Sequence, residues 1–308
     1  MNQLIADLAP WGIGLAAVFS ALSFAGNIWL PFDILSHLRG YFVAMLFAFA
    51  LVHYWSDWSV LLLAICLSIS VLAYNFAGHF AQPIGAANAT AHGDQIKILS
   101  LNTWKNQLDL VRAEQMVRDT GADVVILAEL SNNKLTLLER LQDLYPHQIR
   151  CTKGCWMALL SKRPWNTADS QPRIKGQARM IWATYDGAKR NFNVVGVHLT
   201  NPLDSPWNQS LGIENLGTKI RAIAGPTIVA GDMNASPWSN IYKRIPEATG
   251  LRDLNYRKPS WPVAFWLPAQ LPIDHFFVSD DIAVERITYG SRVGSDHLPL
   301  IGEFRLPD

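Results

Sequence analysis

Charge is distributed very unevenly along this chain, and this constrains its fold more than any other feature. The first 93 residues contain only four charged side chains (Asp7, Asp33, Arg39 and Asp57), whereas the rest is ordinarily polar. Helices that are apolar all round are buried, either in a large core or in a membrane. We therefore expect an apolar part at residues 1–79 and a separate globular domain at residues 96–308.

The apolar part contains three candidate membrane spans, at about residues 11–30, 40–55 and 58–78. About 20 apolar residues can cross a bilayer, and the second segment is near the lower limit. A cleaved signal peptide would explain only the first segment, which lacks a basic start. A soluble core would require three helices without polar faces. We predict about three transmembrane helices.

Two features bear on the side of the membrane at which the globular domain lies. The positive-inside rule would place Arg39, and with three spans also the domain, in the cytoplasm. Cys151 and Cys155 flank a turn and could close a disulfide, which persists in an oxidising compartment. Two unpaired thiols are the alternative, because spacing does not establish bridge geometry. We favour an integral protein of the inner or plasma membrane with an extracytoplasmic domain.

A change of pattern follows a linker at residues 80–95, which is rich in Ala, Gly, Asn and Thr. Helical spacing is expected at 108–120, 134–145 and 209–224. Strands outnumber helices and often follow each other directly, which favours two packed sheets flanked by helices over a doubly wound sheet. Strands are expected at 96–101, 123–128, 157–160, 180–185, 192–197, 227–230, 273–279, 282–287 and 300–304.

Acids, amides and imidazoles stand at the ends of these apolar runs. They are Asn102, Glu129, His198, Asp232, Asn234, Asp274, Asp296 and His297. A metal-assisted hydrolase needs such groups to converge in one cleft. A carboxylate after a buried strand is costly unless it meets a cation, and Mg²⁺ prefers oxygen ligands.

Taken singly, each of these motifs has a structural alternative. Asp232 and Asn234 are two apart on an extended segment, so they can share a face, where a carboxylate could activate water. They could equally cap a strand-to-turn junction. Asp274 could orient the imidazole of His297, although each Asp-His pair alone could be a surface turn.

The net charge does not select a substrate. The first 93 residues carry −2 and the whole chain +1, which leaves +3 for residues 94–308. Proteins that bind nucleic acid mainly through phosphate attraction are far more basic.

The ordered series of motifs resembles the endonuclease/exonuclease/phosphatase superfamily of DNase-I-like hydrolases over about residues 96–304. The motifs are Leu101-Asn102, Ala128-Glu129, Val197-His198-Leu199, Gly231-Asp232-Met233-Asn234, Pro272-Ile273-Asp274-His275 and Gly294-Ser295-Asp296-His297 with Pro299. Residues 158–164 and Ser260-Trp261-Pro262 resemble a bacterial membrane-attached branch. The resemblance implies a four-layer α/β sandwich, in which helices cover two packed mixed sheets and the site lies at one rim.

The resemblance also implies a divalent metal, Mg²⁺ with Mn²⁺ as the alternative. Glu129 would bind it, with Asn102 beside it and Asp296 as a further ligand or base partner. Arg179 is a candidate phosphate contact, although a surface position is the more common one for an arginine. His275 would support the site from behind.

Five residues would carry the reaction. Asp232 would position or activate the attacking water, and Asn234 would hold the phosphate. His198 would contact the scissile phosphate or the leaving group. His297 would contact the phosphate and be oriented by Asp274.

We therefore expect a membrane-anchored, Mg²⁺-dependent phosphoester hydrolase, most simply a phosphodiesterase or nuclease-type enzyme in which water attacks phosphorus. The alternatives are a sphingomyelinase-like or phospholipase-like lipid phosphodiesterase, a phosphomonoesterase, and a non-catalytic membrane binding module. The expected partners are the membrane and a phosphoester, either nucleic acid or a phospholipid headgroup, with no obligate protein partner. A nuclease needs a basic groove with aromatic rings that stack on the bases, and the candidates for such a groove are Trp104, Lys105, Trp207 and Trp261.

Overall fold

The structure is a computed structural model that describes residues 2–53, 65, 93–151, 154–254, 257–263 and 270–307. It divides into two compact units. The first comprises Met1–Gln82 together with the short segment Trp238–Tyr242. The second comprises Pro83–Pro237 and Lys243–Asp308.

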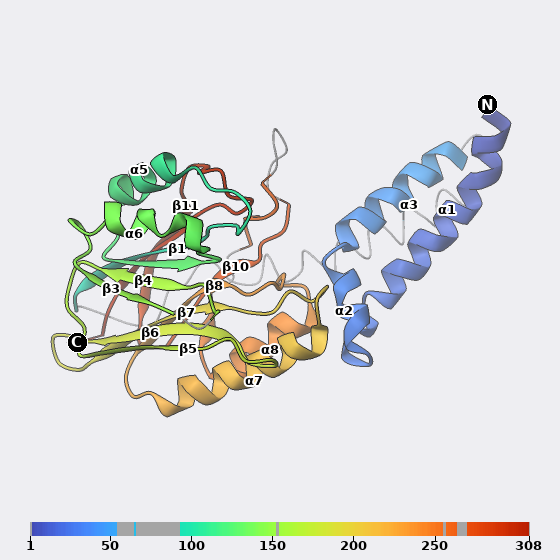
Figure 1. Ribbon diagram of the computed structural model, residues 1–308. Helices are drawn as coiled ribbons and strands as arrows, with labels where there is room; N and C mark the ends of the chain where they lie inside the picture. The colour runs from blue at the N-terminus through green and yellow to red at the C-terminus, as the bar shows by residue number, and fades with distance from the viewer. Residues whose placement is uncertain are drawn as a thin grey trace. The chain divides into compact units, whose positions relative to one another are not determined.

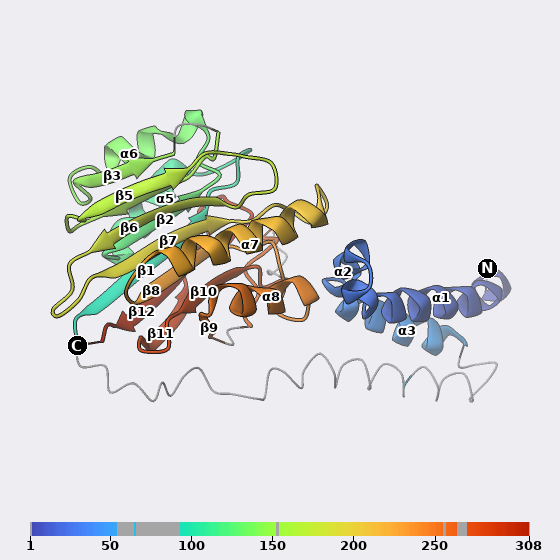
Figure 2. The same cartoon turned by 90° about the horizontal axis from the view of Figure 1, so that it is seen from below.

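The first unit is helical. Its elements are α1 (Asn2–Leu22), η1 (Ala25–Asn27), α2 (Leu30–Ser36) and α3 (Arg39–His53). Helices α1 and α3 run side by side in both views (Figures 1 and 2), and the rings of Phe19 and Phe42 stack with centroids 5.6 Å apart.

The predicted span at residues 11–30 is wrong as a single helix, because α1 ends at Leu22 and the chain turns through η1. Ser23 Oγ donates to the carbonyl of Ser20 at this end, and Pro31 at the start of α2 cannot continue a preceding helix. No single described helix is long and apolar enough to cross a membrane. Helices α2 and α3 pass that test only as a pair, which is bent by 61°. The predicted span at 58–78 lies outside the described residues, apart from Ile65 in a helix.

Arg39 differs from the solvated loop charge that the positive-inside argument assumed. It begins α3, is buried, and donates from Nε to Ser23 Oγ (2.8 Å) and from Nη1 to the Trp238 carbonyl (3.1 Å). Asp33 is also buried and accepts the backbone N–H of Asn240 (2.8 Å). Both charges therefore serve hydrogen bonds inside the first unit.

The second unit contains two six-stranded mixed sheets. The first has the order β11 (Ala283–Tyr289), β12 (Leu300–Arg305), β1 (Gln95–Asn102), β2 (Val124–Ala128), β4 (Ala158–Ser161) and β3 (His147–Arg150). The second has the order β5 (Thr167–Gln171), β6 (Arg179–Tyr185), β7 (Phe192–His198), β8 (Thr227–Asp232), β10 (Asp274–Val278) and β9 (Arg252–Asp253). The pairs β1–β2 and β7–β8 are parallel and the other pairs are antiparallel.

The sheets pack face to face, and helices cover both outer faces (Figures 1 and 2). Helices α5 (Leu110–Thr120) and α6 (Thr136–Arg140) lie on the first sheet, and α7 (Pro206–Ala222) and α8 (Asn240–Thr249) on the second. The continuous apolar run of β2 is buried at all five positions, as its sequence predicts. The prediction of two mixed sheets flanked by helices is confirmed.

Several elements differ from the sequence prediction. The helix expected at 134–145 shrinks to α6, preceded by the 3₁₀ turn η2 (Asn132–Lys134). Strands β3, β5 and β9 were not predicted; β3 and β5 are polar edge strands without an apolar run, and β9 has two residues. Helix α8 was missed because Pro246 interrupts its helical pattern.

Candidate active site

Strand register aligns four of the predicted residues in one row across the second sheet. Arg179 pairs with His198, His198 with Asp232, and Asp232 with Asp274, on β6, β7, β8 and β10. Residues opposite each other on adjacent strands present their side chains to the same face. The row therefore joins residues that lie up to 95 positions apart in the sequence.

Two further predicted residues come from the first sheet. Asn102 ends β1, and Glu129 follows the last residue of β2. Asn102 Nδ2 donates to Asp232 Oδ2 at 3.0 Å, which links the two sheets. His198 Nε2 lies 3.7 Å from Glu129 Oε1 and 3.7 Å from Asp232 Oδ2. The site thus forms where the ends of both sheets meet.

Gly231 permits the close approach of β7 and β8 at this point. A Cβ at this position would lie 1.8 Å from the Val197 carbonyl oxygen, and its φ of 151° is one that L side chains rarely adopt. Only glycine therefore allows the pairing that places His198 opposite Asp232.

Positive φ angles at non-glycine residues concentrate around the site. They occur at Trp104 (49°), Glu129 (54°) and Asn234 (48°), as well as at Trp156. Such conformations persist when surrounding bonds impose them, and they often mark functional sites. Glu129 is held by the Lys105 backbone N–H, which donates to its Oε2 at 2.9 Å.

Asp232 is buried and surrounded by donors. Its Oδ1 accepts the Asn234 backbone N–H (2.8 Å), and its Oδ2 accepts the side-chain amides of Asn102 (3.0 Å) and Asn234 (3.3 Å). Burial raises the pKa of Asp232 to about 7, although the nearby His297 and these hydrogen bonds oppose the shift. A carboxylate with such a pKa suits a general base near neutral pH.

His297 is held by Asp274, as the sequence predicts. Its Nδ1 lies 2.8 Å from Asp274 Oδ2, and its Nε2 lies 3.8 Å from Asp232 Oδ2. Burial acts to lower the pKa of His297, but the carboxylates of Asp274, Asp232 and Asp296 outweigh it and raise the pKa to about 10. This imidazole is therefore a cation at neutral pH.

His198 has the opposite character. Arg179 Nη1 lies 3.0 Å from its Nδ1, and a guanidinium can only donate, so Nδ1 accepts and Nε2 carries the hydrogen. Burial, Arg179 and His297 together lower the pKa of His198 well below its usual value. The site thus contains one charged and one neutral imidazole, and Arg179 is part of it rather than an isolated surface arginine.

Asp296 offers an unused oxygen to the site. The Trp261 indole N–H donates to its Oδ2 at 2.9 Å, whereas its buried Oδ1 has no hydrogen-bond partner among the described residues. That oxygen lies 3.9 Å from His297 Nε2.

A divalent cation fits the carboxylates beside these imidazoles. Ligand atoms of Asp232, Asp274 and His297 lie within 4.8 Å of one another, but His297 as an imidazolium has no lone pair for a metal. Two carboxylate oxygens nearby can bind one: Asp296 Oδ1, 3.9 Å from His297 Nε2, and Glu129 Oε1, 3.7 Å from His198 Nε2. Hard cations such as Mg²⁺ take oxygen ligands of this kind.

Sequence reasoning missed the residues that hold the site from behind. Ser295 Oγ donates to the Asn102 carbonyl (2.6 Å) and accepts the His297 N–H (3.0 Å). Ser260 Oγ accepts the Asp274 N–H (3.3 Å). Lys134, at the start of the helix that the sequence predicts at 134–145, was given no role in the site, but it is buried, and burial lowers its pKa to about 8. Serine and lysine carry no sequence signal for such roles.

His275 lies outside the catalytic row because alternate residues of a strand point to opposite faces. Its Nε2 is 3.1 Å from the Ala235 carbonyl and 3.0 Å from the Pro272 carbonyl. His275 therefore lies behind the Asp232–Asn234 segment, and its supporting role stays a prediction.

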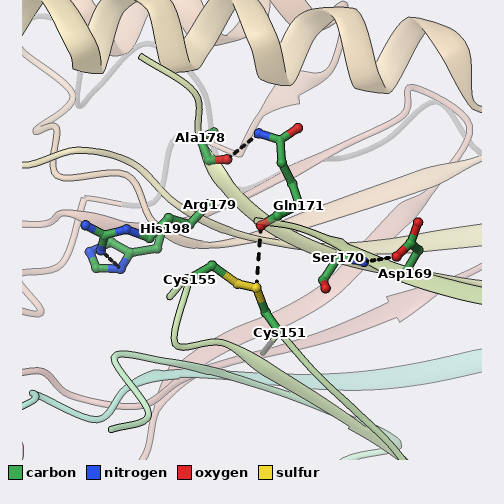
Figure 3. The surroundings of a disulfide bond; sticks show 8 residues. All are labelled: Cys151, Cys155, Asp169, Ser170, Gln171, Ala178, Arg179 and His198. Atoms are coloured by element: carbon green, nitrogen blue, oxygen red, sulfur yellow. Dashed lines mark hydrogen bonds between the residues drawn. A yellow bond between two sulfur atoms is a disulfide. The ribbon is translucent and has the colours of Figure 1, made fainter. Parts of the chain in front are cut away.

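Cys151 and Cys155 form a disulfide at the turn between β3 and β4, with their Cα atoms 5.8 Å apart (Figure 3). Cys151 Sγ lies 3.5 Å from the carbonyl oxygen of Gln171. Gln171 Nε2 in turn donates to the Ala178 carbonyl (2.7 Å), next to Arg179. The crosslinked turn therefore lies beside the end of β6 that carries Arg179.

Comparison with known proteins identifies the family of this chain. The sequence profile of the Endonuclease/Exonuclease/phosphatase family matches residues 99–297, which include all the residues of the site. The chain belongs to the endonuclease/exonuclease/phosphatase family. Members of this family are metal-dependent phosphoesterases, among them nucleases, phosphatases and sphingomyelinases.

Among curated proteins, this chain is similar to a UPF0294 protein of Yersinia pseudotuberculosis, with 30% identity over 129 residues. That match covers 41% of this chain and 46% of the relative, so the chain spans about half the length of the curated relatives it matches.

Solved structures share the fold. Truncated TDP2 of Caenorhabditis elegans is 18% identical with a TM-score of 0.56, covering 68% of this chain and 98% of that one. Sphingomyelinase C of Streptomyces griseocarneus is 15% identical with a TM-score of 0.53, covering 68% and 99%. A beta toxin mutant of Staphylococcus aureus with bound magnesium ions is 16% identical with a TM-score of 0.54, covering 68% and 99%. These identities support the fold alone.

Proposed function

We propose that this chain is a Mg²⁺-dependent phosphodiesterase in which water attacks phosphorus directly. The observation that carries the proposal is the meeting of a base with a pKa of about 7, Asp232, and a cationic imidazole, His297, at one end of the two sheets. A phosphodiester needs a base for the water and positive charge for the developing negative oxygens.

Each side chain has a role that its contacts support. Asp232 takes the proton of the attacking water, since its carboxylate is fixed by Asn102 and Asn234. Asn234 acts by holding Asp232, because its side-chain amide donates to Asp232 Oδ2 (3.3 Å) and to the Leu199 carbonyl (3.0 Å) and keeps no further N–H for the phosphate. His297, fixed by Asp274, presents its Nε2–H to a phosphate oxygen.

His198 directs its Nε2–H toward the carboxylates of Glu129 and Asp232, because Arg179 occupies its Nδ1. It can donate that hydrogen to the scissile phosphate or the leaving oxygen. Arg179 supports the phosphate indirectly, through this imidazole.

Glu129, Asn102 and the free oxygen of Asp296 would hold the metal ion. When bound, Mg²⁺ or Mn²⁺ would polarise the phosphate and neutralise developing negative charge.

Nucleic acid is the substrate class we place first. Trp104 follows Asn102 with its backbone N–H on the Asn102 side chain, and Trp261 contacts Asp296 and lies 6.3 Å from the His297 ring. Aromatic rings beside a phosphoester site can stack on bases. A phospholipid headgroup diester is the second candidate, favoured by the apolar first unit.

We also propose that the first unit attaches the enzyme to a membrane. Leu8, Trp11, Leu15 and Val18 are all at least half exposed and recur at helical spacing on α1. The disulfide favours an extracytoplasmic domain, because such bonds persist in oxidising compartments. A reporter fused after Asp308 tests this topology, and a cytoplasmic signal contradicts it.

The activity is tested with the full chain on DNA, RNA, phospholipid vesicles and a phosphomonoester, each with Mg²⁺. Asp232→Ala and His198→Ala should each lose about 10²–10⁴ in kcat/KM. Asp143→Ala and His147→Ala are matched controls, because both residues lie away from the site. Asp143 forms an exposed ion pair with Arg118, and His147 begins the edge strand β3. Cleavage that persists in the site variants or after metal chelation contradicts the proposal.

The four substrates separate the alternatives. If only the phospholipid vesicles are hydrolysed, the enzyme is a lipid phosphodiesterase. If only the phosphomonoester is hydrolysed, it is a phosphatase. If no phosphoester is cleaved, the non-catalytic binding module is favoured.

A further inference from the structure

Lys134 is a buried lysine directly behind the ends of β1 and β2. It ends the 3₁₀ turn η2 and is only 2% exposed. Its Nζ donates to the Thr103 carbonyl oxygen at 2.8 Å and to the Trp104 carbonyl oxygen. Lysine is almost never fully buried without partners, so these two bonds define its position.

The two carbonyls belong to peptide groups whose N–H sides face the site. The Trp104 N–H, in the same peptide as the Thr103 carbonyl, donates to Asn102 Oδ1 at 2.9 Å. The Lys105 N–H, in the same peptide as the Trp104 carbonyl, donates to Glu129 Oε2 at 2.9 Å. Because a peptide group is planar, fixing its carbonyl also fixes the direction of its N–H.

The loop needs such fixing. Trp104 has a φ of 49° and Glu129 a φ of 54°, and side chains other than glycine are strained there. The Thr103 N–H and hydroxyl are bound to the Ala128 carbonyl, at 2.8 and 3.0 Å, which ties the loop to the end of β2. Lys134 is the cation that holds the next two peptides in the same loop.

We propose that Lys134 is a positioning residue, which through the peptides 103–104 and 104–105 orients Asn102 and Glu129 for the divalent metal. The inference rests on the proposed function for the identity of the metal site. Partners behind metal ligands typically change metal affinity or activity by 10–100-fold when they are lost.

The sign of the effect separates positioning from simple electrostatics. Lys134 carries positive charge near the carboxylates of Glu129 and Asp296. If it acted only through charge, its removal would strengthen the binding of a divalent cation, because like charges repel. If it orients the ligands, its removal weakens binding.

The test compares Lys134→Met, which removes the charge and the donors, with Lys134→Arg, which keeps both. Lys162→Met is the matched control, since Lys162 Nζ also donates to a backbone carbonyl, that of Gly121, before the opposite end of β2. Mn²⁺ binding to the full chain is measured by electron paramagnetic resonance. We expect about tenfold weaker binding in Lys134→Met, partial recovery in Lys134→Arg and no change in Lys162→Met.

A second measurement works without metal or substrate. Hydrogen exchange of the Trp104 and Lys105 amides in metal-free protein should accelerate at least about tenfold in Lys134→Met and not in Lys162→Met. Unchanged exchange, or unchanged or tighter Mn²⁺ binding, overturns the inference. Absence of phosphoester hydrolysis in the wild type contradicts the proposed function instead, while the exchange result still decides the role of Lys134.

Discussion

Replacing Asp274 with Asn should make the activity sensitive to alkali. The two side chains are nearly isosteric, so the Asn oxygen can still accept the hydrogen bond from His297 Nδ1 that spans 2.8 Å in the wild type. The variant loses the negative charge beside a buried imidazolium. His297 should therefore lose its proton at a lower pH.

The size of this effect follows from the surroundings of His297. Burial acts to lower the pKa of His297, but the nearby carboxylates of Asp274, Asp232 and Asp296 raise it from 6.5 to about 10. At about 1.4 kcal/mol per pKa unit, this shift is a preference for the imidazolium of ~5 kcal/mol. Asp274 is the nearest of the three, and we assign it roughly 2–3 kcal/mol, or about 2 pKa units. The pKa in the variant is then expected near ~8.

The assay is the pH dependence of kcat/KM on a water-soluble phosphodiester with Mg²⁺, from pH 6 to 10. Above about pH 8, the ratio of kcat/KM in Asp274→Asn to that in wild type should fall about tenfold for each pH unit. Asp143→Asn is the control, because Asp143 is exposed and forms an ion pair with Arg118 away from the site. A variant-to-wild-type ratio that stays constant across this range refutes the assigned role of the imidazolium.

Stability in metal-free protein gives an independent check on the same pair. The folded-state pKa of His297 lies above its unfolded value, so its contribution is fully present below about pH 6.5 and is lost as the pH rises toward 10. The free energy of unfolding of wild type should therefore exceed that of Asp274→Asn between about pH 6 and 8, where His297 is charged in both proteins, and the gap should shrink as the pH rises toward 10. A gap that widens toward pH 10 contradicts this linkage.

Three further predictions test the metal site, the strand pairing and the disulfide. Mg²⁺ at 100 times its Kd should stabilise the wild type by about 2.7 kcal/mol in thermal melts, and Glu129→Gln should lose this gain while Glu139→Gln, on α6, keeps it. Gly231→Ala should destabilise the fold by more than about 3 kcal/mol in urea unfolding, because its Cβ would meet the Val197 carbonyl. The control is Gly250→Ala, whose Cβ has open space. Equal stability of the two variants contradicts the packing argument. Removing the disulfide with Cys155→Ser should lower the free energy of unfolding by about 2 kcal/mol without changing the apparent Kd for Mn²⁺. If the reduced and the oxidised wild-type protein are equally stable, this prediction is wrong.

Much of the second unit could be predicted from local patterns. The apolar runs of β1, β2, β7 and β8 identify buried strands, because side chains that are buried on both faces of a strand must be apolar. Edge strands β3 and β5 escaped prediction because their polar residues form no apolar run. Helix α8 has apolar residues at helical spacing, but Pro246 inside it argues against a helix. The first predicted span failed for a related reason, since hydropathy does not mark the turn at Ser23.

The sequence by itself determined which residues were candidates for the chemistry, because acids, amides and imidazoles recur in order at the ends of successive apolar runs, although each one alone could cap a strand or form a turn. Only the tertiary structure decided how they meet. Register aligns Arg179, His198, Asp232 and Asp274. At that meeting point burial and Arg179 keep His198 neutral, whereas the surrounding carboxylates outweigh burial and keep His297 charged. Lys134 shows the same limit, because its role depends on two peptide groups that no sequence pattern connects to it. Composition and spacing are local properties, whereas a pKa and a ligand's orientation depend on atoms brought together from distant parts of the chain.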